Sequence, residues 1–142
     1  MLNILVPVDG SENANRAVLY ARQLAQGAGS ARIHLLNIQT PVQGRAGLSR
    51  LITQDMIDEF YLREGQEATD EARKLLDVTG ADYISHVEFG HVATEIAGYA
   101  QDHGCARIVM GTRGNGSLAN ILIGSVANQV LQLAEAPVTL VK

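Results

Sequence analysis

The chain has 142 residues, 46% of them hydrophobic, and a formal net charge of −4. This length fits one ordinary domain with a sizeable core, and an aromatic content of only 4% makes that core aliphatic. The acidic balance argues against nucleic acid or an anionic membrane surface as the main partner.

Cysteine usage and the N-terminal residues indicate the compartment. The single cysteine, Cys105, excludes an internal disulfide framework and fits a reducing environment. The first residues lack a basic segment followed by a long apolar run, so we expect no signal peptide. No apolar stretch approaches the roughly 20 residues that span a bilayer. We therefore expect a cytoplasmic protein with no membrane partner.

Apolar runs alternate with amphipathic segments along the whole chain. The first run, Leu2–Val8, predicts a buried strand, and Ser11 and Glu12 behind it favour the start of a helix. Periodicity and glycine stops predict the other elements. The further strands are expected at Arg32–Ile38, Asp82–Phe89, Ala106–Gly111 and Pro137–Val141. The helices are expected between Ser11 and Gly27 and at Gln54–Thr79, Val92–His103 and Ser125–Glu135.

This alternation predicts an α/β fold in a single domain over residues 1–142. Strands that alternate with helices form a mostly parallel sheet with helices on both faces. Ligands of such open sheets bind beyond the carboxyl ends of the strands, where the strand order reverses. Polar residues follow the first strand at Asp9-Gly10-Ser11 and the fourth at Gly111–Ser117. If those two strands are neighbours, the five-stranded order is 3-2-1-4-5 and the site lies between strands one and four.

A glycine-rich stretch follows the fourth strand and ends where the last helix begins. It reads Met110-Gly111-Thr112-Arg113-Gly114-Asn115-Gly116-Ser117, and Gly124-Ser125 opens the helix. Glycine allows a backbone to come close to a ligand. The N–H groups and the dipole at a helix N-terminus attract an anion. Together these features predict a ligand that carries phosphate.

The spacing Gly111-x-x-Gly114, nine residues, Gly124-Ser125 resembles the motif of ATP-binding universal stress proteins. The segments Ile4-Leu5-Val6-Pro7-Val8-Asp9-Gly10-Ser11 and Ala136-Pro137-Val138 are also similar to that family, so the resemblance covers essentially the whole chain. It implies a Rossmann-like fold of the adenine nucleotide alpha hydrolase-like type and an adenine nucleotide, ATP, AMP or ADP, as ligand.

The resemblance also implies which residues hold the nucleotide. Asp9 is expected under the ribose and adenine. The base pocket is expected to include Pro7, Val8 and Ile38. The ribose is expected to approach Met110 and Gly111. The phosphates are expected to be held by backbone N–H groups and a serine hydroxyl at Gly114, Gly124, Ser125 and Val126. A Mg²⁺ or Mn²⁺ ion that bridges phosphates would be ordinary for such a ligand.

Several of these residues also have a purely structural interpretation. A glycine after a strand can serve a plain turn, and Asp9 can cap the following helix. Ser125 is also expected as the N-cap of the last helix, because capping and phosphate binding use the same N–H groups. Arg113 fits a phosphate contact or a solvated loop charge equally well. For Arg45 and Arg50, an exposed loop is favoured over closure on the ligand.

Several enzyme signatures are absent from the sequence. It has no Walker loop, and its only lysines are Lys74 and Lys142. It also has no Gly-x-Gly-x-x-Gly after the first strand, no Gly-x-Ser-x-Gly, no His-x-Gly-His and no Ser-Gly-Gly-x-Asp-Ser. The histidines fall in different predicted elements and, even with Cys105, do not suggest the three or four ligands of a zinc site. They are His34, His86, His91 and His103.

The leading hypothesis is a homodimeric, ATP-binding regulator in the stress response that acts by binding rather than by turnover. The alternatives are a slow ATP hydrolase, for which no base or arginine finger is evident, and an interaction module with an empty glycine loop. The apolar strand Val138–Val141 is expected at a sheet edge, where it pairs with a second copy. The long polar connection Gln39–Thr53 is the best candidate for a part that responds to the nucleotide.

Overall fold

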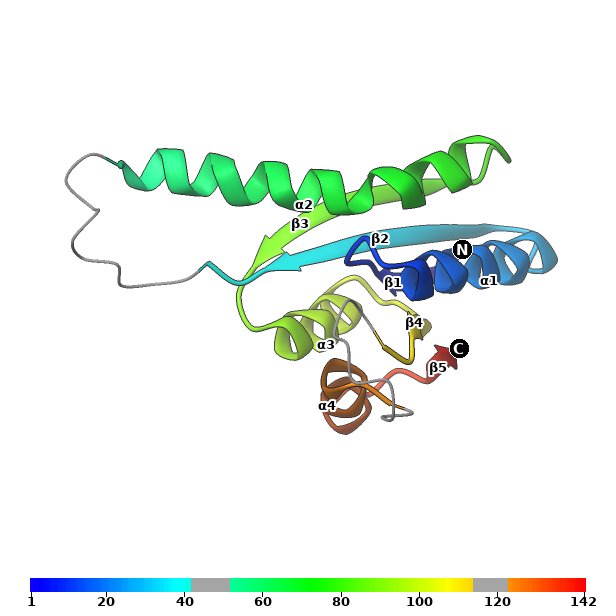
Figure 1. Cartoon of the computed structure of the whole chain (residues 1–142). Helices are drawn as coiled ribbons and strands as arrows, with labels where there is room; N and C mark the ends of the chain where they lie inside the picture. The colour runs from blue at the N-terminus through cyan, green and yellow to red at the C-terminus, as the bar shows by residue number, and fades with distance from the viewer. Residues whose placement is uncertain (42–51, 114–122) are drawn as a thin grey trace.

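The computed structural model describes residues 1–41, 52–113 and 123–142, and within them five strands alternate with four helices (Figure 1). The strands are β1 Leu2–Pro7, β2 Ala31–Gln39, β3 Tyr83–Phe89, β4 Arg107–Gly111 and β5 Val138–Val141. The helices are α1 Glu12–Gly27, α2 Gln54–Asp77, α3 Val92–Asp102 and α4 Ser125–Leu133. Each matches a predicted element to within a few residues at its ends.

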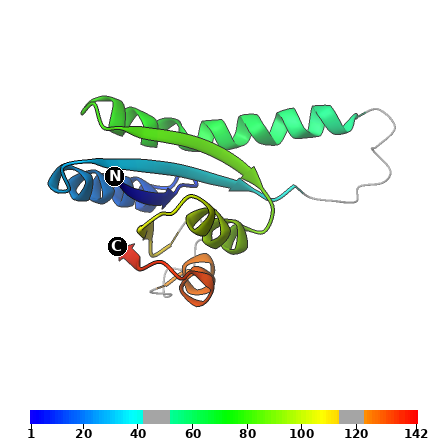
Figure 2. The same ribbon diagram turned by 180° about the vertical axis from the view of Figure 1, so that it is seen from behind.

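All neighbouring strands of the sheet pair in parallel, in the order β3-β2-β1-β4-β5. This is the predicted order, so the expected reversal between β1 and β4 is confirmed. α1 and α2 cover one face of the sheet, and α3 and α4 cover the other, as the opposite views of Figures 1 and 2 show. No helix in the described residues has the length and apolar character needed to cross a membrane.

The central strand β1 is apolar from Ile4 to Pro7 because both faces of this stretch are covered by helices. Ile4 and Val6 pack into the core beneath α1 and α2, whereas Leu5 packs into the core beneath α3 and α4. Successive side chains of a strand point to opposite faces, so a strand between two helical layers reads as a continuous hydrophobic run. The two cores hold β1 in the middle of the sheet, and its exit is thereby fixed beside the exit of β4.

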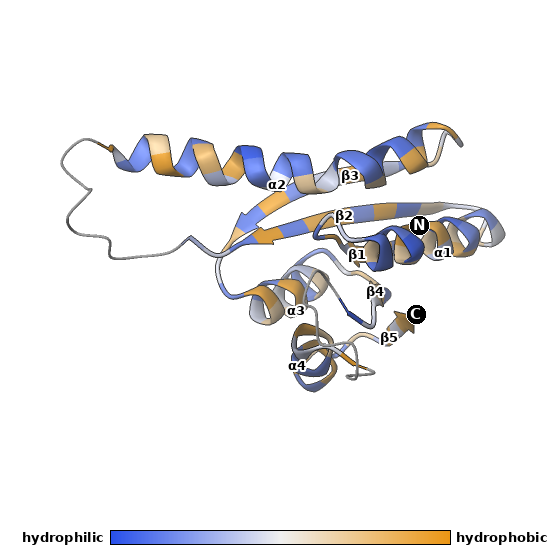
Figure 3. Cartoon of the chain, in the orientation of Figure 1, coloured by the Kyte–Doolittle hydropathy of each residue, from blue (hydrophilic) through white to orange (hydrophobic). Residues whose placement is uncertain are grey.

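Helices α1 and α2 begin at side-chain caps, and each buries one face. The Ser11 hydroxyl accepts a hydrogen bond from the Ala14 N–H at 3.1 Å, and the Thr53 hydroxyl accepts one from the Met56 N–H at 3.2 Å. These bonds satisfy N–H groups that have no partner inside a helix. Hydrophilic and hydrophobic residues alternate along α2 (Figure 3). Its buried residues recur every three or four positions, at Gly65, Thr69, Ala72 and Leu76.

Candidate functional site

A cavity of about 410 Å³ opens beyond the carboxyl ends of β1, β2 and β4. In the sheet, β1 has β2 as its neighbour on one side and β4 on the other, so the strand order reverses at β1. The cavity lies at this reversal, which is where ligands of open α/β sheets bind. α3 and the first turn of α4 complete its walls. The sequence-based prediction of the site between strands one and four therefore coincides with a real cavity.

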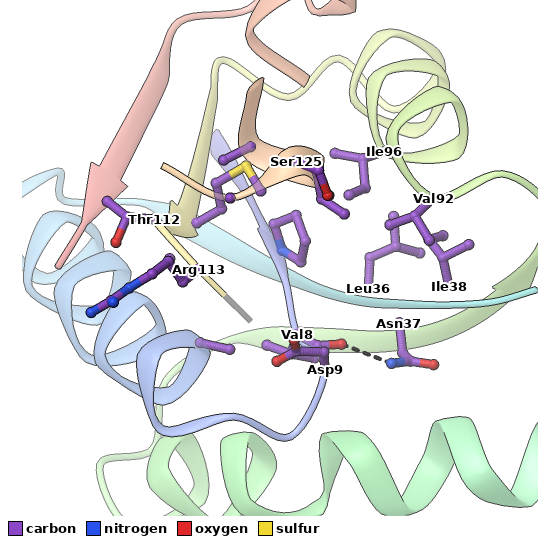
Figure 4. Close-up of a pocket in the computed structure, with 17 residues that line it drawn as sticks. Val8, Asp9, Leu36, Asn37, Ile38, Val92, Ile96, Thr112, Arg113 and Ser125 are labelled. Carbon is purple, nitrogen blue, oxygen red and sulfur yellow. Dashed lines mark hydrogen bonds between the residues drawn. The ribbon is translucent and has the colours of Figure 1, made fainter. Parts of the chain in front are cut away.

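One wall of the cavity is apolar. Leu36 and Ile38 point from β2 toward Val92 and Ile96, which lie one turn apart on α3 (Figure 4). Leu36 and Ile96 are fully buried or nearly so. Aliphatic side chains that face one another in this way suit a flat apolar group such as an aromatic ring.

Asp9 lies at the mouth of the cavity, two residues after the end of β1, and is exposed. Its carboxylate accepts a hydrogen bond from the Ser11 N–H at 3.0 Å, which stabilises the turn into α1. The cap of that helix is Ser11 itself. Asp9 therefore supports the turn without capping the helix, and its carboxylate remains at the cavity edge (Figure 4).

The floor beside Asp9 depends on a buried amide. The Asn37 Nδ2 donates to the Val8 carbonyl at 2.8 Å (Figure 4), and the Gln39 Nε2 donates to the Asn37 Oδ1 at 2.8 Å. Asn37 is buried in the central stretch of β2, where an amide without partners would be costly. Its bonds fix the backbone of Val8 where β1 leaves the sheet.

The opposite wall is built from backbone at the exit of β4 and the start of α4. The Gly124 N–H donates to the Thr112 carbonyl at 2.6 Å. Gly124 has extended backbone angles and is the N-cap of α4. Ser125 and Val126 follow it in the first turn and line the cavity. The first N–H groups of a helix have no partner within it, so this wall presents donors to an anion.

The expectation that Ser125 is an N-cap is wrong. Gly124 occupies that position, Ser125 is the first helical residue, and α4 has no side-chain capping bond. The physical reason is the hydrogen bond from the Gly124 N–H to the Thr112 carbonyl. This bond holds Gly124 in the N-cap position, so the helix begins one residue earlier than it would with Ser125 as the cap. The Ser125 hydroxyl is therefore not used by the helix as a cap.

Every predicted site residue that the structure describes lines this cavity. They are Pro7, Val8, Asp9, Ile38, Met110, Gly111, Arg113, Gly124, Ser125 and Val126. Gly114, Arg45 and Arg50 lie outside the described residues. The Arg113 side chain is exposed and directed away from Ile38 and Val92, along the side of α1 (Figure 4).

Comparison with known proteins settles the family. A family model described as "Universal stress protein family" matches residues 1–142. The chain belongs to the universal stress protein family. Its sequence is 32% identical over 139 residues to universal stress protein MJ0531 of Methanocaldococcus jannaschii, covering 98% of this chain and 81% of that protein.

Solved structures show the same fold. The universal stress protein UspA from Lactobacillus plantarum superimposes with a TM-score of 0.83 at 24% identity, covering 99% of this chain and 97% of that one. A universal stress protein from Archaeoglobus fulgidus, solved in complex with dAMP, gives a TM-score of 0.73 at 24% identity and covers 100% and 98%. The resemblance inferred from the glycine motif is confirmed, and so is the fold that it implied.

Sequence reasoning missed several residues of this universal stress protein's cavity. The α3 side chains Val92 and Ile96 were assigned only to a helix, and the buried Asn37 was not singled out. A signal for Asn37 exists, since it is a polar residue in the apolar run Leu35-Leu36-Asn37-Ile38. No comparable signal marks the α3 residues, because apolar positions at helical spacing are typical of any core.

The structure also brings together histidines that the sequence places in separate elements. His34, His86 and His103 surround Tyr99, with the His103 and Tyr99 rings stacked at a centroid distance of 3.8 Å. Among the described residues, no three histidine, cysteine or acidic side chains are arranged to hold a metal ion. Cys105 is buried nearby, and burial raises the pKa of its thiol to about 11.

Proposed function

We propose that this universal stress protein binds ATP in the cavity between β1 and β4 and acts through that binding rather than through turnover. The observation that carries the proposal is the pairing of an apolar wall with a wall of helix N–H groups in one cavity. The first suits an adenine base and the second suits a phosphate tail. AMP and ADP share the base and ribose and are ligands of the same pocket.

The arrangement gives each part of the nucleotide a matching surface. The base is assigned to Pro7, Val8, Ile38 and the α3 side chains, and the ribose to Asp9, whose carboxylate accepts hydrogen bonds from hydroxyls, and to Met110 and Gly111. The phosphates are assigned to Gly124, Ser125 and Val126, with Gly114 and Arg113 beside them. The Archaeoglobus fulgidus relative in complex with dAMP supports an adenine nucleotide as the ligand class.

A divalent ion fits this site only together with the nucleotide. Asp9 is the one carboxylate among the described residues that line the cavity, and a Mg²⁺ or Mn²⁺ ion needs about six oxygen ligands. The phosphate oxygens and water molecules would supply the ligands that the protein lacks. Such an ion would neutralise charge on the phosphate tail, and Asp9 would orient the ribose beside it.

The composition of the cavity favours binding over hydrolysis. Its described lining residues include no histidine, lysine or glutamate. Its one described carboxylate, Asp9, is assigned to the ribose, and the side chain of its one described arginine, Arg113, runs along α1, so neither is assigned as a general base or as a stabiliser of a leaving phosphate. A nucleotide that is held without being consumed changes a protein only if two states of the protein bind it with different affinity. We therefore infer a cytoplasmic regulator that reports the presence of the nucleotide to a partner.

Assembly through β5 follows from its place in the sheet. Val138–Val141 is the last strand beyond β4 and is half-buried along its whole length. Two apolar edges of this kind can pair antiparallel about a two-fold axis and remove each other's unpaired backbone groups. We propose that the protein is a homodimer joined by this strand.

Titration calorimetry with ATP, AMP and GTP tests the proposal. ATP and AMP should bind and GTP should bind much more weakly, because the apolar wall offers no partner for the guanine edge. Purified protein incubated with ATP should release little phosphate. Absence of ATP binding would refute the proposal. Rapid turnover that is lost in a Ser125→Ala variant would make ATP hydrolysis, and not binding alone, the main function.

A further inference from the structure

Asn13 joins three parts of the chain that are far apart in sequence. It lies in the first turn of α1 and is 8% exposed. Its Oδ1 accepts a hydrogen bond from the Arg113 N–H at 2.7 Å, and its Nδ2 donates to the Val141 carbonyl at 3.0 Å. Arg113 follows β4 and Val141 ends β5. One side chain therefore ties α1 to the exits of both strands.

The chemistry of the two partners requires an amide at this position. A backbone N–H can only donate and a backbone carbonyl can only accept, so the side chain between them needs one acceptor and one donor. An aspartate of the same size would face the Val141 carbonyl with a second acceptor, and a leucine would satisfy neither group. Because Asn13 is buried, an unsatisfied partner would carry a desolvation cost.

The bonds of Asn13 continue into the wall that faces the cavity. The Val141 carbonyl also accepts the Thr112 N–H at 2.9 Å, and the Thr112 carbonyl accepts the Gly124 N–H at 2.6 Å. The position of residues 112 and 113 therefore sets where Gly124 begins α4. Asn13 holds that segment through its bond to the Arg113 N–H without lining the cavity itself.

Because Gly111 has no side chain, there is room beside it for the Asn13 amide. A Cβ built at Gly111 would overlap the Oδ1 and Cγ atoms of Asn13. The backbone of Gly111 has no positive φ, so this contact, and not the backbone conformation, excludes a larger residue. The first glycine of the motif is thus matched to Asn13 inside the protein.

We propose that Asn13 is a positioning residue for phosphate binding. It fixes residues 112 and 113 and, through Thr112, the N–H groups at the start of α4 that hold the phosphates. This inference rests on the proposed function. Loss of the amide should weaken ATP binding by about three- to tenfold, the range of one net hydrogen bond. Adenosine should be little affected, because the apolar wall of the cavity makes no bond to Asn13.

The test is the affinity for ATP compared with that for adenosine. Both ligands are titrated into the wild-type protein, Asn13→Ala and the matched control Asn15→Ala, which makes the same change two residues further along the same helix. We expect ATP affinity to fall only in Asn13→Ala, and adenosine affinity to stay within about twofold in all three. A general loss of structure would weaken both ligands together. An unchanged ratio of the two affinities in Asn13→Ala would overturn the inference.

Two further variants keep the test decisive. Asn13→Ser places a residue favoured at helix starts in the same turn, and its short hydroxyl cannot bridge Arg113 and Val141, so it should show the same shift if Asn13→Ala does not fold. Gly111→Ala should lose ATP affinity in the wild-type background and lose less when Asn13 is already alanine. If the losses of ATP affinity in the two single variants simply add in the double variant, Gly111 and Asn13 do not act as a matched pair.

The wild-type titration separates this inference from the proposed function. If the wild-type protein does not bind ATP, the proposed function fails and the role of Asn13 fails with it. If it binds ATP and the Asn13 variants retain the wild-type preference for ATP over adenosine, only the role of Asn13 fails.

Discussion

The Nδ1 atom of His34 lies 3.0 Å from the hydroxyl oxygen of Tyr99, at the contact between β2 and α3. The Nε2 atom of the same ring lies 3.3 Å from Asn3 Oδ1 on β1. Burial raises the pKa of Tyr99 to about 12, so its hydroxyl keeps its proton and donates to His34. The neutral imidazole then accepts at Nδ1 and donates from Nε2, and it links the sheet to the helix that carries Val92 and Ile96.

This arrangement predicts that the protein loses stability in mild acid. Burial, followed by the charges of His103, His86 and Arg32, lowers the pKa of His34 from its ordinary value of 6.5, and Asp82 opposes this only in part. The unfolded chain therefore binds more protons at this residue than the folded one. The free energy of unfolding should be at its full value above pH 6.5 and should fall as the pH drops below it.

Urea denaturation at pH 7.5 and pH 5.5 measures this effect. His34→Gln, which hydrogen-bonds but does not titrate, should reduce the difference between the two pH values, whereas His91→Gln, a change at an exposed histidine outside the cluster, should not. An equal pH dependence in wild type and His34→Gln would show that other groups are responsible.

Two helical glycines should respond in opposite ways to the same substitution. A Cβ at Gly65 in α2 would lie 2.5 Å from Val87 Cγ1, whereas a Cβ at Gly98 in α3 would meet nothing within 4 Å. Gly98→Ala should stabilise the protein by roughly 0.5–1 kcal/mol through helix propensity alone. Gly65→Ala should destabilise it by about 1–3 kcal/mol, because overpacking outweighs that gain.

Thermal and urea unfolding of the two variants provide the comparison. Adding Val87→Ala should remove part of the cost of Gly65→Ala, since the two side chains compete for the same space. A stabilising Gly65→Ala would mean that α2 moves away from β3 at little cost.

Substituting the serine before α1 should lower stability, whereas substituting the serine at the start of α4 should weaken ATP binding. Ser11 caps α1 through its hydroxyl, so Ser11→Ala should cost about 1 kcal/mol of stability. Ser125 is not a cap, so Ser125→Ala should change stability by less than Ser11→Ala does, and should weaken ATP binding. Urea denaturation and ATP titration of both variants measure the two effects. A loss of stability in Ser125→Ala equal to that in Ser11→Ala would contradict the cap assignment.

The difference between these two serines shows how far sequence reasoning reaches. The apolar run at β1 and the polar residues that follow β1 and β4 predict the sheet order and the place of the cavity once strands one and four are taken as neighbours, and the structure confirms that order. The N-cap of α4 could not be predicted, because a tertiary bond from Gly124 to Thr112 determines it. Local preference for serine at an N-cap is overridden by that bond.

Contacts across long stretches of sequence account for the other omissions. Gly111 was interpreted as a glycine that lets a ligand approach, whereas the structure shows that the space beside it holds the Asn13 amide. The meeting of His34, His86 and His103 depends on the register of β2 with β3 and on how α3 packs on the sheet. Neither relationship has a signature in residue type or local spacing.

The proposed homodimer makes a prediction about the outer edge of β5. The Pro137 carbonyl accepts a hydrogen bond from the Ile108 N–H of β4, and the Val141 carbonyl accepts one from the Thr112 N–H just after β4. Because the backbone groups of a strand alternate in direction, the N–H of Leu140 points to the outer edge. Leu140→Pro removes that N–H without removing a bond to β4. We expect the variant to be a monomer in sedimentation velocity at concentrations where the wild type is a dimer.

Leu140→Ile keeps the N–H and an apolar side chain and should remain dimeric. A dimeric Leu140→Pro variant would place the interface elsewhere on the protein, since one missing donor at the centre of a short antiparallel pair leaves its partner carbonyl unsatisfied.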